Sequence, residues 1–304
     1  MTTGGAYLVV GADSLVGSGL CRSLERRRHL TFSTTRRRAT LSERRIYLDF
    51  EDLDGFSLRR SVDYAFVVAA ATNYERCESD PLAHHINVEL IPKLVGSLLK
   101  DGVFVTFIST NAVFGGERPW PLEDDPHAPG IAYARQKAAA EEAIRLTAGR
   151  LGAENQLNVV RLTKILDRKT SPLPDWFSTW AHGGAVAAFS DLIFAPMSAR
   201  FVGEALATIG EKRIPGNLHL SGAENVSYVD FANLLAERTG VDDRLVHATT
   251  STERGVQLTF QPRFSGLGMR RTTSLCGVKP QALKDVINDL VDNECALQRP
   301  TDAA

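Results

Sequence analysis

The chain has 304 residues, 43% of them hydrophobic, and a formal net charge of −1. This length suits one large domain or two unequal ones, and the hydrophobic content is sufficient for a full core. The balanced charge gives no field that would favour nucleic acid or an anionic membrane, and no run reaches the roughly 18 apolar residues that a membrane helix needs.

Strands and helices alternate along the first half of the chain. The first run, Ala6-Tyr7-Leu8-Val9-Val10, lacks polar alternation, as expected of a strand buried on both faces of a parallel sheet. Strands are expected at 6–10, 30–34, 44–48, 64–68, 103–108 and 157–162, with helices at 14–28, 81–100 and 133–149. This alternation predicts an α/β fold, a Rossmann-like doubly wound parallel sheet covered by helices on both faces.

The pattern changes after residue 163, where prolines become frequent. We expect residues 1–162 to form a nucleotide-binding Rossmann domain and residues 163–304 a smaller substrate-binding lobe, parts of which can return to the main domain. Ligands bind at the carboxyl edge of such sheets, where this lobe would lie. The expected elements of the lobe are a short helix around Trp176 and Trp180, helices at 198–210, 228–239 and 280–292, a strand at 217–220, and an irregular basic segment at 244–275.

A glycine-bearing turn follows the first strand. Gly11 permits a tight turn, Gly17 permits close packing of helix on strand, and the helix N-terminus offers backbone N–H groups to a pyrophosphate. Ser14 stands where the usual three-glycine pattern has its middle glycine. An ordinary strand–turn–helix would use the same glycines, but the position after the first strand favours nucleotide binding. The predicted cofactor contacts here are Gly11, Asp13, Ser14, Leu15, Val16 and Gly17.

Three arginines, Arg36, Arg37 and Arg38, follow the second strand, where the adenosine ribose of a dinucleotide would lie. An acidic residue there binds the 2′-hydroxyl of NAD, whereas a basic cluster accommodates the 2′-phosphate of NADP. We therefore predict NADP(H) in preference to NAD(H), with Arg36 as the contact; a solvated charge run is the alternative. Asp49, after the third strand, is predicted to accept a hydrogen bond from the adenine amino group.

Tyr133 and Lys137 lie four residues apart, so both project from one face of a helix. A nearby ammonium lowers the pKa of a tyrosine, which then exchanges protons with a carbonyl or alcohol near neutral pH. This spacing is common by chance, but Thr110 at the end of the fifth strand adds a hydroxyl able to bind a substrate carbonyl. Thr110, Tyr133 and Lys137 are therefore the predicted catalytic residues.

At these motifs the chain resembles the extended short-chain dehydrogenase/reductases, and within them the dTDP-4-dehydrorhamnose reductase group. The resemblance covers most of the chain, including Gly11 to Gly17, Ala69-Ala70-Ala71-Thr72, Cys77-Glu78-Ser79-Asp80-Pro81, Ser109-Thr110, Tyr133 with Lys137, and His219-Leu220-Ser221-Gly222. It implies hydride transfer from NADPH to a sugar ketone, with Tyr133 as the proton donor. It also implies that Lys137 holds the nicotinamide ribose, that Ala69, Ala70 and Ala71 line the cofactor, and that Asn87 supports the site.

Two departures from the family pattern bear on the substrate. The reductases usually carry Arg-Thr-Ser-Trp after the sixth strand, where this chain has Arg161-Leu162-Thr163-Lys164. A lysine suits a carboxylate, a phosphate or a differently substituted sugar, and Trp176 or Trp180 is a candidate for the stacking role. Asn111 and Ala112 lack the two carboxylates of a sugar-nucleotide dehydratase. The predicted substrate contacts are Thr72, Asn73, Asn111, Lys164, Trp176 and Arg263, the last of which suits a diphosphate or simply faces solvent.

Three functions are consistent with these motifs: an NADPH-preferring reductase of a nucleotide-linked 4-keto deoxysugar, an NAD(P)-dependent nucleotide-sugar epimerase, and a cofactor-binding regulatory subunit without turnover. No metal site, nucleic-acid partner or membrane partner is predicted, and the resemblance allows a homodimer. The N-terminal residues lack a signal sequence, and four dispersed cysteines indicate reduced thiols. A cytoplasmic protein is therefore expected.

Overall fold

The computed structural model describes residues 5–56 and 61–297 of the chain. Its centre is a seven-stranded sheet in the order β11-β6-β5-β4-β1-β2-β3, with every pair of neighbours parallel. The predicted α/β doubly wound fold is therefore confirmed. The strands are β1 (Ala6–Val10), β2 (Leu30–Thr35), β3 (Arg45–Tyr47), β4 (Tyr64–Val67), β5 (Phe104–Thr110), β6 (Leu157–Leu162) and β11 (Gly216–Leu220).

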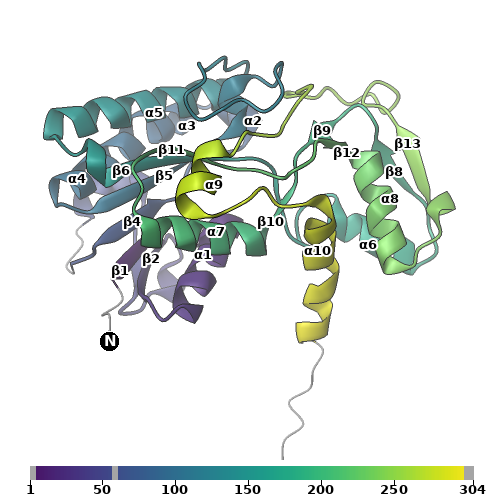
Figure 1. Cartoon of the computed structure of the whole chain (residues 1–304), viewed down its shortest axis with the longest axis horizontal. Coiled ribbons are helices and arrows are strands. Elements are labelled where there is room, and N and C mark those ends of the chain that lie inside the picture. The colour runs from purple at the N-terminus through teal and green to yellow at the C-terminus, as the bar shows by residue number, and fades with distance from the viewer. Residues whose placement is uncertain (1–4, 57–60, 298–304) are drawn as a thin grey trace, which may run out of the picture.

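Helices cover both faces of this sheet and bury it in two separate hydrophobic clusters (Figure 1). The strands have apolar side chains on both sides for this reason. Helices α1 (Leu15–Arg26) and α7 (Ala199–Lys212) pack on one face, and α4 (Ile91–Lys100) and α5 (Ala132–Leu151) on the other. The helix expected at 81–100 consists of α3 (Pro81–His85), a π-helical turn (Ile86–Leu90) and α4.

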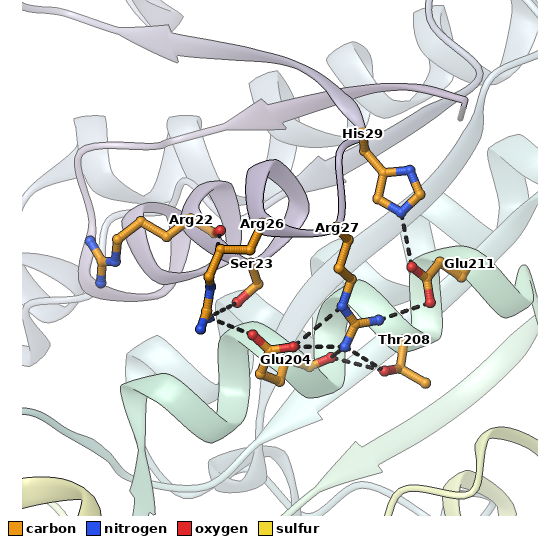
Figure 2. A network of polar contacts seen from close by, with 8 residues as sticks. All are labelled: Arg22, Ser23, Arg26, Arg27, His29, Glu204, Thr208 and Glu211. Atoms are coloured by element: carbon orange, nitrogen blue, oxygen red, sulfur yellow. Dashed lines mark hydrogen bonds and ion pairs between the residues drawn. The ribbon is translucent and has the colours of Figure 1, made fainter. Parts of the chain in front are cut away.

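Two elements from beyond residue 163 complete the main body. Strand β11 pairs with β6, and α7 lies against α1. Figure 2 shows the polar network between these helices: Arg27 donates to Glu204 and Glu211 of α7, each at 2.8 Å, and His29 contacts Glu211 at 2.9 Å. Exposed ion pairs contribute little individually, so the network chiefly fixes how α7 lies on α1.

A smaller lobe has its own hydrophobic cluster and lies at the right in Figure 1. Strands β8 and β13 pair in parallel, and the three helices of this lobe supply most of the other buried residues. Two short ladders, β7 with β10 and β9 with β12, lie at its junction with the sheet. The bounds are α6 (Leu173–Ala181), α8 (Tyr228–Thr239), α10 (Leu283–Leu297), β7 (Ile165–Leu166), β8 (Val186–Phe189), β9 (Ile193–Phe194), β10 (Met197–Ser198), β12 (Val226–Ser227) and β13 (Val246–Thr249).

The prediction that residues 244–275 are irregular was wrong at both ends, because β13 and α9 (Arg270–Cys276) lie there. The sequence also did not predict α2 (Tyr74–Ser79). All three elements are short, and tertiary packing stabilises such segments more than their intrinsic propensity does. None of the helices within the described part of the chain is long and apolar enough to cross a membrane.

Candidate active site

A cleft of about 820 Å³ lies at the carboxyl ends of the sheet strands, with residues of the smaller lobe on its far wall. This is the edge at which ligands bind in open α/β sheets. The structure brings many of the predicted site residues together here. Those lining the cleft are Ser14, Leu15, Val16, Ala70, Thr72, Asn73, Thr110, Asn111, Tyr133, Lys137 and Lys164.

The glycine turn presents the N-terminus of α1 to the cleft. Gly11 has a φ of +91°, and a Cβ there would lie 2.7 Å from the backbone nitrogen of Ala69. A Cβ on Gly17 would overlap the carbonyl of Gly11. Ser14 caps α1, since its hydroxyl donates to the Gly11 carbonyl at 2.8 Å and accepts from the Gly17 N–H at 3.1 Å. This tight turn and free helix terminus fit the pyrophosphate of a nicotinamide dinucleotide.

The basic run lies beside the glycine turn but outside the residues that line the cleft. Asp13 engages two arginines, because it pairs with Arg45 and lies 4.0 Å from Nε of Arg37. Arg38 lies over the ring of Tyr47 at 4.0 Å.

Arg36 is exposed and makes no ion pair or hydrogen bond with any residue in 5–56 or 61–297. It is therefore the arginine of this run whose side chain is free for a ligand. The Asp49 carboxylate caps the following 3₁₀ turn by accepting from the N–H of Glu51 at 3.3 Å.

The three predicted catalytic side chains come from two neighbouring elements. Thr110 ends β5, and Tyr133 and Lys137 lie in the first turns of α5. The Lys137 ammonium donates to the Ile108 carbonyl at 2.6 Å and lies over the Phe107 ring at 4.0 Å. Burial lowers the pKa of Lys137 to about 7, although the charge of nearby Glu141 acts in the opposite direction.

The prediction that Lys137 lowers the pKa of Tyr133 does not agree with the surroundings of this phenol in the structure. Burial raises the pKa of Tyr133 above its ordinary value. The hydrogen bond with the Thr110 side chain acts in the opposite direction but has the smaller effect. The Lys137 ammonium is directed at a backbone carbonyl instead. The phenol is therefore held in its protonated form at neutral pH, which is the form that a proton donor requires.

Asn87 lies behind the site and does not line the cleft. Its buried amide accepts from the Ala71 N–H and donates to the Ala71 carbonyl, both at 2.9 Å, and also donates to Gln136 at 2.8 Å. It thus fixes the loop after β4, of which Ala70 faces the cleft and Ala69 packs against Gly11.

The proposed stacking role of Trp176 is not supported by its position. Trp176 is 5% exposed in the core of the smaller lobe, where it packs against Trp180 and Tyr228. Sequence reasoning missed the aromatic side chains that do line the cleft, above all Tyr74, whose ring lies 5.4 Å from that of Tyr133, and Phe260, which meets Tyr74 edge-on at 6.5 Å. The one local sign of Tyr74 in the sequence is Asn73 before it, a residue type that favours a helix start and is the N-cap of α2.

Several predicted substrate contacts have structural partners of their own. Asn73 accepts from the N–H of Arg76 at 2.8 Å as that N-cap. Asn111 donates to the carbonyl and the hydroxyl of Ser265 at 2.8 and 3.1 Å, and so holds the loop that covers the cleft. Arg263 is exposed, lies 5.3 Å over the Phe264 ring, and does not line the cleft.

A buried arginine supports helix α5 from behind. Arg161 is 1% exposed and donates twice to Glu141, at 2.8 and 3.1 Å. Its other N–H groups reach the Glu123 carbonyl at 2.9 Å and Nε2 of His219 and His127 at 3.2 and 2.8 Å. Because arginine cannot accept, both imidazoles accept at Nε2, and Nδ1 of His219 donates to the Gly268 carbonyl at 2.8 Å.

His219 predicts a pH dependence of stability. Burial, followed by the charge of Arg161, lowers the pKa of His219 from 6.5 to about 3. Between these values the unfolded state binds more protons, so the free energy of unfolding should fall as pH falls from 6.5 towards 3. Chemical denaturation at pH 4 to 6 should show a slope shallower by up to about 1.4 kcal/mol per pH unit in His219→Leu than in the native chain. Parallel pH profiles would contradict this assignment.

No group of three or more His, Cys, Asp or Glu side chains is placed to hold a metal ion in the described ranges 5–56 and 61–297.

Comparisons with known proteins agree with this geometry. The sequence profile of the family described as RmlD substrate binding domain matches residues 6–295. The spore coat polysaccharide biosynthesis protein SpsK of Bacillus subtilis (strain 168) is 25% identical over 290 residues, which cover 93% of this chain and 95% of that protein.

Among solved structures, the dTDP-4-dehydrorhamnose reductase from Bacillus anthracis str. Ames, in complex with NADP, has a TM-score of 0.78 at 16% identity, covering 96% of this chain and 99% of that one. The UDP-N-acetylglucosamine 4-epimerase from Methanobrevibacter ruminantium M1, in complex with UDP-N-acetylmuramic acid, has a TM-score of 0.80 at 15% identity, covering 98% and 100%. At these identities the likeness shows the fold alone.

Proposed function

The chain belongs to the RmlD substrate binding domain family, and on that premise we propose that it is an NADPH-preferring reductase of a nucleotide-linked 4-keto deoxysugar. The observation that carries the proposal is the convergence of Thr110, Tyr133 and Lys137 on one cleft beside the N-terminus of α1. In this proposal the part of the chain before residue 163 binds the cofactor, and the smaller lobe contributes to the sugar-nucleotide site.

Each catalytic side chain has a distinct role in the proposed reaction. A bound nicotinamide cofactor supplies the hydride. Thr110 holds the oxygen of the sugar ketone by a hydrogen bond, and Tyr133 gives its proton to that oxygen as the alkoxide develops. Lys137 is held by the Ile108 carbonyl at the floor of the site, where its ammonium is placed to bind the ribose of the nicotinamide cofactor.

An epimerase is the second candidate. A UDP-N-acetylglucosamine 4-epimerase shares the fold, and the same three side chains suit proton transfer in either direction. A regulatory subunit without turnover is the third candidate, and the presence of all three catalytic side chains in one cleft argues against it.

The test is consumption of NADPH by the purified protein in the presence of dTDP- and UDP-linked 4-keto-6-deoxy sugars. A reductase oxidises one NADPH for each sugar reduced. An epimerase is recognised with the matching 4-hydroxy sugar nucleotides, which it interconverts through bound NAD(P)⁺ without net oxidation of NADPH. A regulatory subunit binds NADPH and leaves every sugar in the panel unchanged, and that result would contradict both enzyme proposals for these substrates.

Arg36→Ala should weaken the binding of NADPH much more than that of NADH. The exposed guanidinium of Arg36 has no partner among the described residues, and a charge-assisted hydrogen bond to a 2′-phosphate contributes about 1.5–3 kcal/mol, or roughly 10- to 100-fold in Kd. Fluorescence titration of both cofactors measures the ratio. Arg38→Ala is a control, since that guanidinium lies over Tyr47. Equal losses for the two cofactors would remove Arg36 from the 2′-phosphate site.

A further inference from the structure

The charged side chains that line the cleft are Glu75, Lys137 and Lys164. The ammonium of Lys137 is occupied by the Ile108 carbonyl and the Phe107 ring. In contrast, the ammonium of Lys164 makes no ion pair or hydrogen bond with any residue that the structure describes, Glu75 included. Lys164 is therefore a cation available to a ligand in this cleft.

Backbone hydrogen bonds fix the position of the main chain from which the Lys164 side chain extends. The Lys164 carbonyl accepts from the Met197 N–H at 2.8 Å, and the preceding Thr163 N–H donates to the Leu220 carbonyl at 3.2 Å. In the parallel pairing of β5 with β6, Leu162 lies opposite Thr110. Lys164 is two residues further on, about 7 Å along the chain. Its flexible four-carbon stem can therefore bring the ammonium close to a substrate held at Thr110.

Apolar side chains share the cleft with the exposed Lys164. Ile165, Ile193 and Phe194 line the same cleft. Although the side chain is accessible from the cleft, the neighbouring protein atoms lower the pKa of Lys164 by burial. A partly desolvated cation without a counter-charge costs free energy, and an anionic ligand would offset that cost.

We propose that Lys164 binds an anionic group of the substrate within reach of the reacting carbon, so that the cleft selects a negatively charged group at this position. That the substrate is a sugar nucleotide rests on the function proposed above. Two parts of such a molecule have the required chemistry: a carboxylate carried by the sugar, and the diphosphate that links sugar and nucleoside.

The experiment measures binding, so it does not depend on turnover. Calorimetric titrations of the full chain would compare UDP-glucuronate, UDP-glucose and UDP, together with the corresponding thymidine compounds, in the presence of saturating NADPH. The variants are Lys164→Gln, which removes the charge, and Lys164→Arg, which retains it. Lys169→Gln is the matched control, because it removes an exposed lysine that does not line the cleft.

If the sugar carries the anion, Lys164→Gln should weaken UDP-glucuronate roughly 10- to 100-fold and leave UDP-glucose and UDP unchanged. If the diphosphate is the anion, all three ligands should weaken by a similar factor. Lys164→Arg should retain most of the affinity in either case. Unchanged affinity for every ligand in Lys164→Gln, or equal losses in Lys169→Gln, would overturn the proposal.

These outcomes are separate from those that test the proposed function. Binding that depends on Lys164, without reduction of any keto sugar, would reject the reductase and leave the anion site standing. Reduction of a keto sugar with no effect of Lys164→Gln on binding would reject the anion site and leave the reductase standing.

Discussion

Tyr133→Phe should lower kcat of the proposed reduction by about 10²- to 10⁴-fold while leaving NADPH affinity nearly unchanged. The substitution removes one hydroxyl and keeps the ring that packs on Tyr74. Thr110 can still hold the ketone, but the hydroxyl that gives the proton is lost. Steady-state kinetics and an NADPH titration on the same preparation would separate loss of the proton donor from loss of cofactor.

Tyr7→Phe is the matched control for this change. Tyr7 lies in β1, is buried in the core and does not line the cleft. The same loss of a hydroxyl should leave turnover close to that of the native chain. Turnover that survives in Tyr133→Phe, or falls equally in Tyr7→Phe, would show that Tyr133 is not the acid.

Arg161→Met should lower the free energy of unfolding by about 3–5 kcal/mol, because it leaves a buried carboxylate without its main counter-charge. Glu141 is fully buried and receives two hydrogen bonds from Arg161. The substitution also removes the donors to Glu123, His219 and His127. Urea denaturation monitored by tryptophan fluorescence would measure the change.

Arg145→Met provides the comparison for this second prediction. Arg145 also pairs with Glu141, at 2.6 Å, but its side chain is 33% exposed and Arg161 remains in place. Its loss should cost about 1 kcal/mol or less. The double variant with Arg161→Met and Glu141→Met should recover part of the lost stability, since it removes the unpaired charge. Equal costs for the two arginines would contradict the assigned role of Arg161.

The parts of the fold that the sequence predicts are those with strong local signals. Buried strands such as β1 and β4 are continuous apolar runs, and the carboxyl ends of parallel strands necessarily meet at one edge. The cleft-lining positions of Thr110, Tyr133 and Lys137 therefore follow from the order of elements alone.

The features that the sequence does not predict depend on contacts between distant segments. Phe260 reaches Tyr74 from a loop nearly two hundred residues away, and nothing local marks it as a cleft residue. Trp176 has a flat aromatic ring of the kind that stacks on sugars, but it lies on a helix of the smaller lobe and is buried in the core. In the sequence Arg161 is only a charged residue within an apolar strand. Its five hydrogen bonds to four partner residues become evident only when distant segments converge on β6.

The most direct measurement of the central claim follows a labelled hydrogen from cofactor to sugar. The protein would be incubated with NADPH carrying deuterium at the transferring position and with a dTDP-linked 4-keto-6-deoxy sugar, and the product analysed by mass spectrometry. A reductase gives a product with one deuterium at the new carbinol carbon and consumes an equal amount of NADPH. A sugar that changes configuration without gaining deuterium, or one that is unchanged although NADPH binds, would contradict the account.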